Sequence, residues 1–322
     1  MLFREHQQSQ WPFWPWILVS LISLIDAIWI AVTPIRLATS SQILICLILV
    51  LAAIIAWAAD RFRHNACIYV IGNGIAFAMI AWPALRIFNH LTMTIPLPWT
   101  DDILSQMDIA LGFNWYGYIK WLNDNPLFFH AIEWTYTGLD RYSGGFFIVL
   151  AFLPRQKERC FELLALFIVV ACLSMVIGTF FPAKGSMAFY HPDLSPLVNL
   201  RQTMGTYHLA DMDQLRNQIA PVLNLTKLQG LVTFPSFHTA MGVLLIYVCR
   251  YNRWLLAISL TLNLSMILTT PLLGGHYFID LIGGVLITIF SIVVVQFLAS
   301  FNDKRPSNSE FSGTLFQPTM GK

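Results

Sequence analysis

Long apolar runs recur from the first part of this sequence to the last, and they restrict the fold more than any other feature does. A helix needs about 20 mainly apolar residues to cross a lipid bilayer. About eight segments approach this length: residues 14–33, 41–59, 66–89, 126–153, 160–181, 235–251, 254–273 and 276–300. Only 11% of the residues are charged, whereas a soluble domain carries roughly 25%. We therefore predict an all-α, polytopic membrane bundle of about eight spans.

Charge and cysteine content exclude several classes of partner. The net charge of +2 gives no indication of a nucleic-acid partner. The cysteines lie within apolar runs or at their ends and form no CxxC or Cys/His metal spacing. We therefore expect no metal and no cofactor. The expected partners are the lipid bilayer and a lipid substrate, and nothing in the sequence predicts an oligomeric state.

The distribution of basic residues predicts an orientation. With eight spans both termini share one side, and most of the Lys and Arg residues near the ends of the spans lie there. These are Arg4, Arg61, Arg63, Arg155, Lys157, Arg159, Arg250, Arg253, Lys304, Arg305 and Lys322. The short loops opposite carry only Arg36, Arg86 and Lys120. The positive-inside rule then predicts cytoplasmic termini and places the polar segment 182–234 outside.

Two segments between the expected spans are long. Residues 101–111 place apolar side chains on one helical face and Asp or Ser on the other, which is typical of an interfacial helix. We expect this helix to gate lateral entry of a lipid. Residues 182–234 are the largest polar segment, and loops of this length are usually functional or disordered. The polar tail from Asn302 is expected to be disordered.

Two short motifs carry the residues with the most reactive side chains. Residues 233–239 read TFPSFHT, and residues 274–280 read GGHYFID. Each motif places a histidine, His238 or His276, at the start of an apolar run. Asp280 follows His276 by four residues, so the two side chains share a helix face. The predicted topology puts both histidines on the outer side.

This set of groups is suited to covalent phosphoryl transfer. A carboxylate bonded to one ring nitrogen of His276 would leave the other nitrogen free to attack phosphorus. His238 could protonate the leaving oxygen and then deprotonate the acceptor. Gly275 would let a phosphate approach the backbone closely. The amides at the two helix starts, together with the Ser236 hydroxyl, would suit an anion.

Two other functions are compatible with parts of the pattern. His-x3-Asp on a helix can bind zinc, but the chain has no HExxH motif and only one further matched histidine. A transporter could use Asp26, Glu133, Asp140 and the histidines as a relay, although the chain shows no repeated halves.

The motifs resemble those of a known family. The segments PSFH (235–238) and GHYFID (275–280) are similar to the second and third signature motifs of the type 2 phosphatidic acid phosphatase (PAP2) superfamily. The resemblance implies that His276 accepts the phosphoryl group, that Asp280 orients it and that His238 is the general acid. It also implies a six-helix core in residues 66–301, preceded by two spans in 1–65 and followed by the tail 302–322.

The sequence departs from the usual family pattern in two places. Thr269 and Thr270 stand where the family has Ser-Arg, and the Lys and Arg-Pro elements of the first motif are missing. FPAKG, at 181–185, stands in the place of the first motif. This combination looks more like the inositolphosphotransferase branch, which includes fungal inositol phosphorylceramide synthase.

Other residues must then balance the charge of a phosphate. Lys184 and Arg216 are our candidates, and we expect Arg201 and Lys227 to meet lipid headgroups instead. A pairing among the acidic and basic residues of the fourth span (Glu133, Asp140 and Arg141) is expected to lock the bundle. The sequence thus predicts a metal-independent phosphatase or phosphotransferase that acts on a lipid phosphate at the extracytoplasmic face. The acceptor, either water or an alcohol such as a ceramide-like lipid, is left open.

Overall fold

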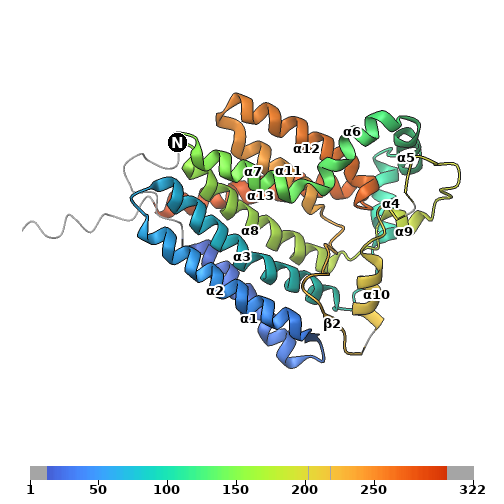
Figure 1. Ribbon diagram of the computed structural model, residues 1–322. Coiled ribbons are helices and arrows are strands. Elements are labelled where there is room, and N and C mark those ends of the chain that lie inside the picture. The colour runs from blue at the N-terminus through green and yellow to red at the C-terminus, as the bar shows by residue number, and fades with distance from the viewer. Residues whose placement is uncertain (1–12, 202, 218, 303–322) are drawn as a thin grey trace, which may run out of the picture.

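The structure is a computed structural model, and it describes residues 13–201, 203–217 and 219–302. Long helices lie side by side in a bundle, and the short helices α4, α5, α9 and α10 gather at one end of it (Figure 1). The predicted all-α membrane bundle is confirmed. The elements are α1 (Trp14–Val32), β1 (Arg36–Leu37), α2 (Thr39–Arg61), α3 (Ala66–Met93), α4 (Asp101–Ala110), α5 (Trp115–Asp124), α6 (Pro126–Thr137), α7 (Leu139–Phe152), α8 (Lys157–Phe180), α9 (Ser186–Tyr190), α10 (Leu209–Asn217), β2 (Val222–Leu223), α11 (Phe237–Val248), η1 (Cys249–Tyr251), α12 (Arg253–Leu273) and α13 (Phe278–Asn302).

Six helices of the described chain are long and apolar enough to cross a membrane, namely α1, α2, α3, α8, α12 and α13. The expected sixth span is the shorter α11 with its one-turn continuation η1. The expected fourth span, 126–153, is not one helix but two, α6 and α7, which meet at Gly138. A Cβ at this glycine would lie 2.8 Å from the carbonyl oxygen of Trp134. A residue with a side chain would clash at the junction of the two helices, whereas glycine fits.

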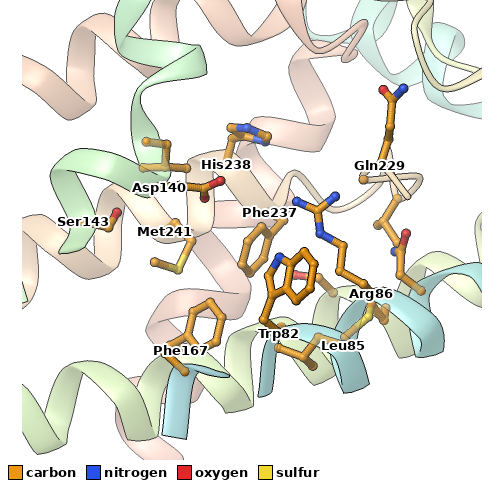
Figure 2. Close-up of a pocket in the computed structure, with 18 of the residues that line it drawn as sticks. Trp82, Leu85, Arg86, Asp140, Ser143, Phe167, Gln229, Phe237, His238 and Met241 are labelled. Carbon is orange, nitrogen blue, oxygen red and sulfur yellow. The ribbon is translucent and has the colours of Figure 1, made fainter. Parts of the chain in front are cut away.

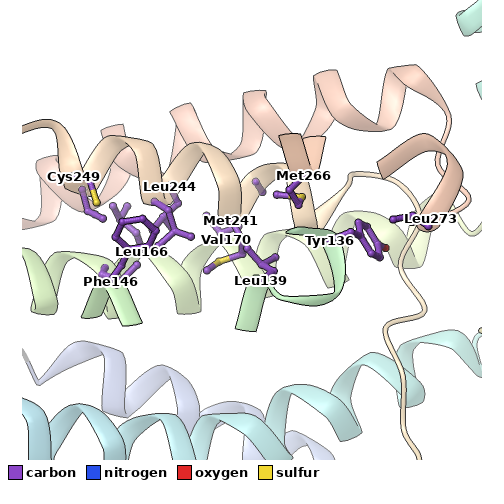
Figure 3. Close-up of a cluster of buried hydrophobic side chains, with 14 of the residues drawn as sticks. Tyr136, Leu139, Phe146, Leu166, Val170, Met241, Leu244, Cys249, Met266 and Leu273 are labelled. Atoms are coloured by element: carbon purple, nitrogen blue, oxygen red, sulfur yellow. The ribbon is translucent and has the colours of Figure 1, made fainter. Parts of the chain in front are cut away.

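The main apolar core lies between α7, α8, α11 and α12. Leu150, Leu166, Leu244 and Met266 are buried in it, one from each of these helices. Figure 3 shows this cluster, with Tyr136 of α6 at the end that faces the loops. The core therefore fixes the position of α11, the helix that carries His238, relative to α12, which leads into residues 274–280.

The amphipathic segment forms α4, but its polar face points inward. Asp101, Ser105 and Asp108 are buried, whereas Ile103 and Met107 are exposed. Asp102 and Gln106 are exposed as well, and the buried carboxylates have partners inside the protein, described below. The polar face of α4 is thus built into the structure of the loops.

The long segment 182–234 is ordered where the structure describes it. Besides α9 and α10 it contains β2, which pairs in parallel with β1 through Arg36↔Val222 and Leu37↔Leu223. This small sheet ties the connection between α1 and α2 to the segment 182–234.

At the opposite end of the bundle, Glu162 of α8 binds Arg159 and Arg250. The cytoplasmic location of that end remains a prediction, as do the domain boundaries at 65 and 301. Arg4 and nearly all of the predicted tail lie outside the described residues.

Candidate active site

His276 and Asp280 form the predicted pair, but His276 lies in the segment just before α13 rather than on that helix. The two side chains are almost completely buried, and the distance from His276 Nδ1 to Asp280 Oδ2 is 3.1 Å. The same carboxylate oxygen accepts a hydrogen bond of 2.9 Å from the backbone N–H of Tyr277. In the tautomer whose Nδ1–H donates to this carboxylate, the neutral ring keeps a lone pair on Nε2; the ring also contacts the backbone carbonyl of Thr233. His276 therefore has one ring nitrogen suited to nucleophilic attack.

His238 lies at the same cavity, on the first turn of α11. Its ring stacks on Tyr136, with ring centroids 4.1 Å apart and an interplanar angle of 9°. The Tyr136 hydroxyl lies 3.3 Å from that of Tyr207, which belongs to the segment 182–234. This aromatic stack holds the His238 ring in one orientation beside the space that His276 also lines.

The cavity that both histidines line has a volume of about 700 Å³. Figure 2 shows part of its wall, with His238, Asp140 and Arg86 at one end and apolar residues such as Phe167 at the other. Its lining includes residues that are exposed on the outside of the bundle, Ile75 and Trp82 of α3 and Gly144 and Ile148 of α7. The cavity therefore reaches the outer surface of the bundle between α3 and α7, at a place where the surface is apolar.

The two buried carboxylates of α4 organise the walls of the site. Asp101 accepts hydrogen bonds from the backbone N–H groups of Lys184 (3.0 Å) and Gly185 (2.9 Å) and from the hydroxyl of Tyr277 (2.9 Å). Asp108 accepts from the backbone N–H groups of Phe278 and Ile279, each at 2.8 Å. Burial raises the pKa of Asp108, while these two hydrogen bonds oppose the shift. Through these bonds α4 positions the segment that carries His276.

Close backbone packing holds residues 185–186 and 205 against the segment 274–280, which carries His276. Gly185, Gly205 and Gly275 all have positive φ. A Cβ on Gly185 would lie 2.5 Å from the carbonyl oxygen of Gly275, and one on Gly275 would lie 2.4 Å from that of Gly205. Ser186 completes the junction, since its N–H donates to the Gly275 carbonyl and its hydroxyl to the His276 carbonyl. No residue with a side chain could replace these glycines without moving the loops.

Ser236 and Gly275, which we predicted to bind phosphate, make structural contacts in this structure. Ser236 is fully buried, and its hydroxyl caps α11 by accepting from the Thr239 N–H. Gly275 is engaged in the junction just described, and neither residue lines the cavity. Of the expected anion-binding amides, those of Phe278 and Ile279 are taken by Asp108. Gly274, which precedes Gly275 in the sequence, does line the cavity.

Lys184 and Arg216 are not brought to the cavity either. The Arg216 guanidinium donates to the carbonyls of Met93 and Leu97 and lies 4.0 Å from the centroid of Trp99. The ammonium of Lys184 lies over the same ring, at 5.4 Å. Both cations therefore pack on Trp99, and Arg216 fastens α10 to the end of α3.

The charged residues of the fourth expected span do not pair with one another as expected. Glu133 binds Arg201 of the segment 182–234 at 3.2 Å and His130 at 3.3 Å. Asp140 lines the cavity, and its carboxylate points toward His238 in Figure 2. Because α6 ends at Thr137 and α7 begins at Leu139, Glu133 lies on a different helix from Arg141, the expected basic partner.

Three further residues of the site were not predicted from the sequence. Arg86 and His208 line the cavity, and Asp101 braces it. His208 is buried and donates from Nε2 to the carbonyl of Lys184 at 2.9 Å. The signal for Asp101 was present in the polar face of 101–111, but a polar face is equally compatible with solvent. Among the described residues, no group of three or more His, Cys, Asp or Glu side chains is placed to hold a metal ion.

Comparison with known proteins supports the motif resemblance. The family model of the PAP2 superfamily matches residues 102–294, which run from the start of α4 to near the end of α13. Searches of curated proteins and of solved structures found no match to the chain.

Proposed function

The chain belongs to the PAP2 superfamily, and we propose that it transfers a phosphoryl group from a membrane lipid through a covalent intermediate on His276. The observation that carries this proposal is the shared cavity. It is lined both by His276, which is oriented by Asp280, and by His238. A nucleophile and a separate acid at one cavity are the minimum that covalent phosphoryl transfer needs.

The first step forms the phosphohistidine. Nε2 of His276 attacks phosphorus with its lone pair, the bond from phosphorus to the leaving oxygen breaks, and His238 donates a proton to that oxygen. Asp280 accepts a hydrogen bond from Nδ1–H throughout and stabilises the positive charge that the ring gains. In the second step His238 removes a proton from the acceptor hydroxyl, whose oxygen attacks phosphorus and releases His276.

The shape of the cavity favours a lipid as the substrate. Its walls are mainly apolar away from the histidines, and it reaches the outside between α3 and α7. A phosphorylated headgroup at the histidines would leave an acyl or isoprenyl chain room to pass between these helices into the bilayer. We place the entry of the lipid here rather than at α4, whose buried face is occupied by Asp101 and Asp108.

The nature of the acceptor divides the proposal into a phosphatase and a phosphotransferase. Water as the acceptor releases phosphate or a phosphorylated headgroup, whereas an alcohol yields a new phospholipid. Inositol-phosphoryl transfer to a ceramide-like lipid is the narrowest form of the second case. The active site would face the extracytoplasmic side.

The test is turnover by purified protein in lipid nanodiscs. A panel of lipids with a labelled phosphorus is supplied with and without alcohol acceptors, and the label is followed into free phosphate, new lipid or protein. We expect wild type to release or transfer the label and to carry acid-labile label on a histidine after rapid quenching. His276→Ala should abolish both signals, and His238→Ala should slow both steps.

The matched control is His64→Ala, which changes an exposed histidine in the turn between α2 and α3. Full turnover by folded His276→Ala protein would overturn the proposal. Movement of intact lipid between leaflets without any change in the label would instead indicate a transporter. Loss of activity on chelation, with recovery on adding zinc, would indicate metal chemistry.

A further inference from the structure

A phosphoryl group brings negative charge into this cavity. The described lining offers one permanently positive side chain to balance that charge. Among the described residues of its lining, Arg86 is the one lysine or arginine. A guanidinium keeps its positive charge inside proteins and presents five N–H donors in a planar fork. Such a fork matches the oxygens of a phosphate.

Arg86 extends from α3 toward the reactive end of the cavity. In Figure 2 its guanidinium points into the space that His238 and Asp140 also face. One Nη1 donor is engaged by the carbonyl of Leu228. Within the described part of the chain this guanidinium makes no other hydrogen bond, so its remaining N–H donors are available to an anion.

The surrounding contacts hold Arg86 in place. The Trp82 ring, one turn earlier on α3, lies 5.9 Å from the guanidinium carbon. Asn89, one turn later, accepts from the backbone N–H of Leu231 at 3.0 Å. Together with the contact to Leu228, this bond fastens the segment before α11 across the side of α3. The arginine thus occupies a rigid position rather than a free surface.

A continuous wall connects Arg86 with the two histidines. Tyr207 lies near Arg86, and burial raises the pKa of its hydroxyl while the arginine charge partly offsets the shift. Its hydroxyl contacts that of Tyr136, whose ring stacks on His238. The cation and the general acid therefore stand on two sides of the same small space.

We propose that Arg86 binds the phosphoryl oxygens of the substrate and holds the phosphorus atom in front of His276. This inference rests on the proposed function for the identity of the reaction, but binding of an anion by Arg86 can be measured without turnover. Arg86 lies in α3, ahead of the family-matched residues 102–294. The chain would thus complete its site with a group from outside the matched region.

The first experiment measures equilibrium binding of orthovanadate and of inorganic phosphate to the full chain in detergent. Arg86→Ala should weaken binding about 10- to 100-fold, the range for lost hydrogen bonds to a charged group. Arg86→Lys should weaken it less, because the charge remains while the fork is lost. Added guanidinium ion should restore part of the anion binding that Arg86→Ala has lost, and it should not strengthen anion binding by wild type.

The matched control is Arg63→Ala, which removes an exposed arginine in the turn between α2 and α3 that does not line the cavity. A thermal unfolding curve for each variant shows whether the lost contact with Leu228 has changed the fold. Unchanged anion binding by folded Arg86→Ala protein would overturn the inference, as would equal weakening by Arg63→Ala.

The outcomes also separate this inference from the proposed function. If wild type binds the anion through Arg86 but never turns over a lipid, the reaction is wrong and the anion site stands. If wild type turns over lipid through His276 and Arg86→Ala has an unchanged KM and kcat, the reaction stands and the anion site is wrong.

Discussion

Asp108 of α4 accepts a hydrogen bond of 2.8 Å from the backbone N–H of Phe278, although 170 positions separate them in the sequence. A second bond of 2.8 Å from Ile279 completes a cap on the first turn of α13. The cap adjoins His276 and ties the segment that carries it to a helix from another part of the chain.

We expect Asp108→Ala to leave two N–H groups near the site without partners. The free energy of unfolding should fall by about 1–3 kcal/mol, and kcat should fall with it because His276 is no longer held. Denaturation curves and initial rates on the same preparations measure both effects. Asp102→Ala, an exposed carboxylate on the same helix, is the control; equal losses in the two variants would show that the cap has no special role.

Gly274→Ala should impair catalysis by crowding His276. A Cβ at this position would lie 2.4 Å from Cδ2 of His276 and 2.6 Å from the Tyr136 hydroxyl, so the imidazole must shift. A displacement of about 1 Å can cost on the order of 100-fold in rate. The control is Gly145→Ala on α7, where a Cβ would meet nothing within 4 Å. Wild-type kcat in folded Gly274→Ala protein would contradict the position of the reactive nitrogen beside this glycine.

A bulky residue at Gly144 should block the opening between α3 and α7. We expect Gly144→Trp to lower kcat/KM for a long-chain lipid by at least about tenfold, equivalent to ~1.4 kcal/mol. A water-soluble analogue with very short chains should be turned over as by wild type, since it needs no room between the helices. Gly145→Trp changes the neighbouring exposed glycine, which does not line the cavity, and serves as the comparison. Equal losses for both substrates would refute the lateral path.

Arg216→Ala should affect stability rather than substrate binding. The variant loses two charge-assisted hydrogen bonds to the carbonyls of Met93 and Leu97, each with a typical value of about 1.5–3 kcal/mol. We expect a lower unfolding temperature and an unchanged KM. Arg201→Ala breaks an exposed pair with Glu133, for which about 0–1 kcal/mol is typical. A large rise in KM for Arg216→Ala without loss of stability would return this residue to the phosphate site.

Stability should fall as the pH is lowered below the usual histidine range, in part because of His208. Burial lowers the pKa of His208 from its usual value of about 6.5. Between the lowered and the usual value the unfolded chain binds a proton that the folded chain does not, so the free energy of unfolding decreases as the pH falls. His208→Gln keeps an N–H donor for the Lys184 carbonyl and removes the titration. Unfolding temperatures measured from about pH 7.5 to 5 should decline less steeply in this variant, and an unchanged slope would contradict the assignment.

The parts of the fold that were predicted correctly depend on neighbouring residues along the chain. The apolar runs identify α1, α2, α3, α8, α12 and α13, because a span is defined by its own length and composition. The fourth run was misread as one helix, since hydropathy alone does not show that the glycine at 138 packs on the carbonyl of Trp134. The pairing of His276 with Asp280 was predicted from helical spacing, but His276 lies just before α13 and its side chain reaches Asp280 on the first turn of that helix.

The sequence by itself determined that the chain is an all-helical membrane bundle and that His276 and Asp280 lie close enough along the chain to pair, because both depend on neighbouring residues. Only the tertiary structure decided which face of α4 is buried, which amides are already capped and which cation enters the cavity. Each of these depends on contacts between distant segments, such as Asp108 with Phe278 or Arg86 with Leu228. An amphipathic pattern identifies two faces of a helix, but the contacts with neighbouring segments select the one that turns inward.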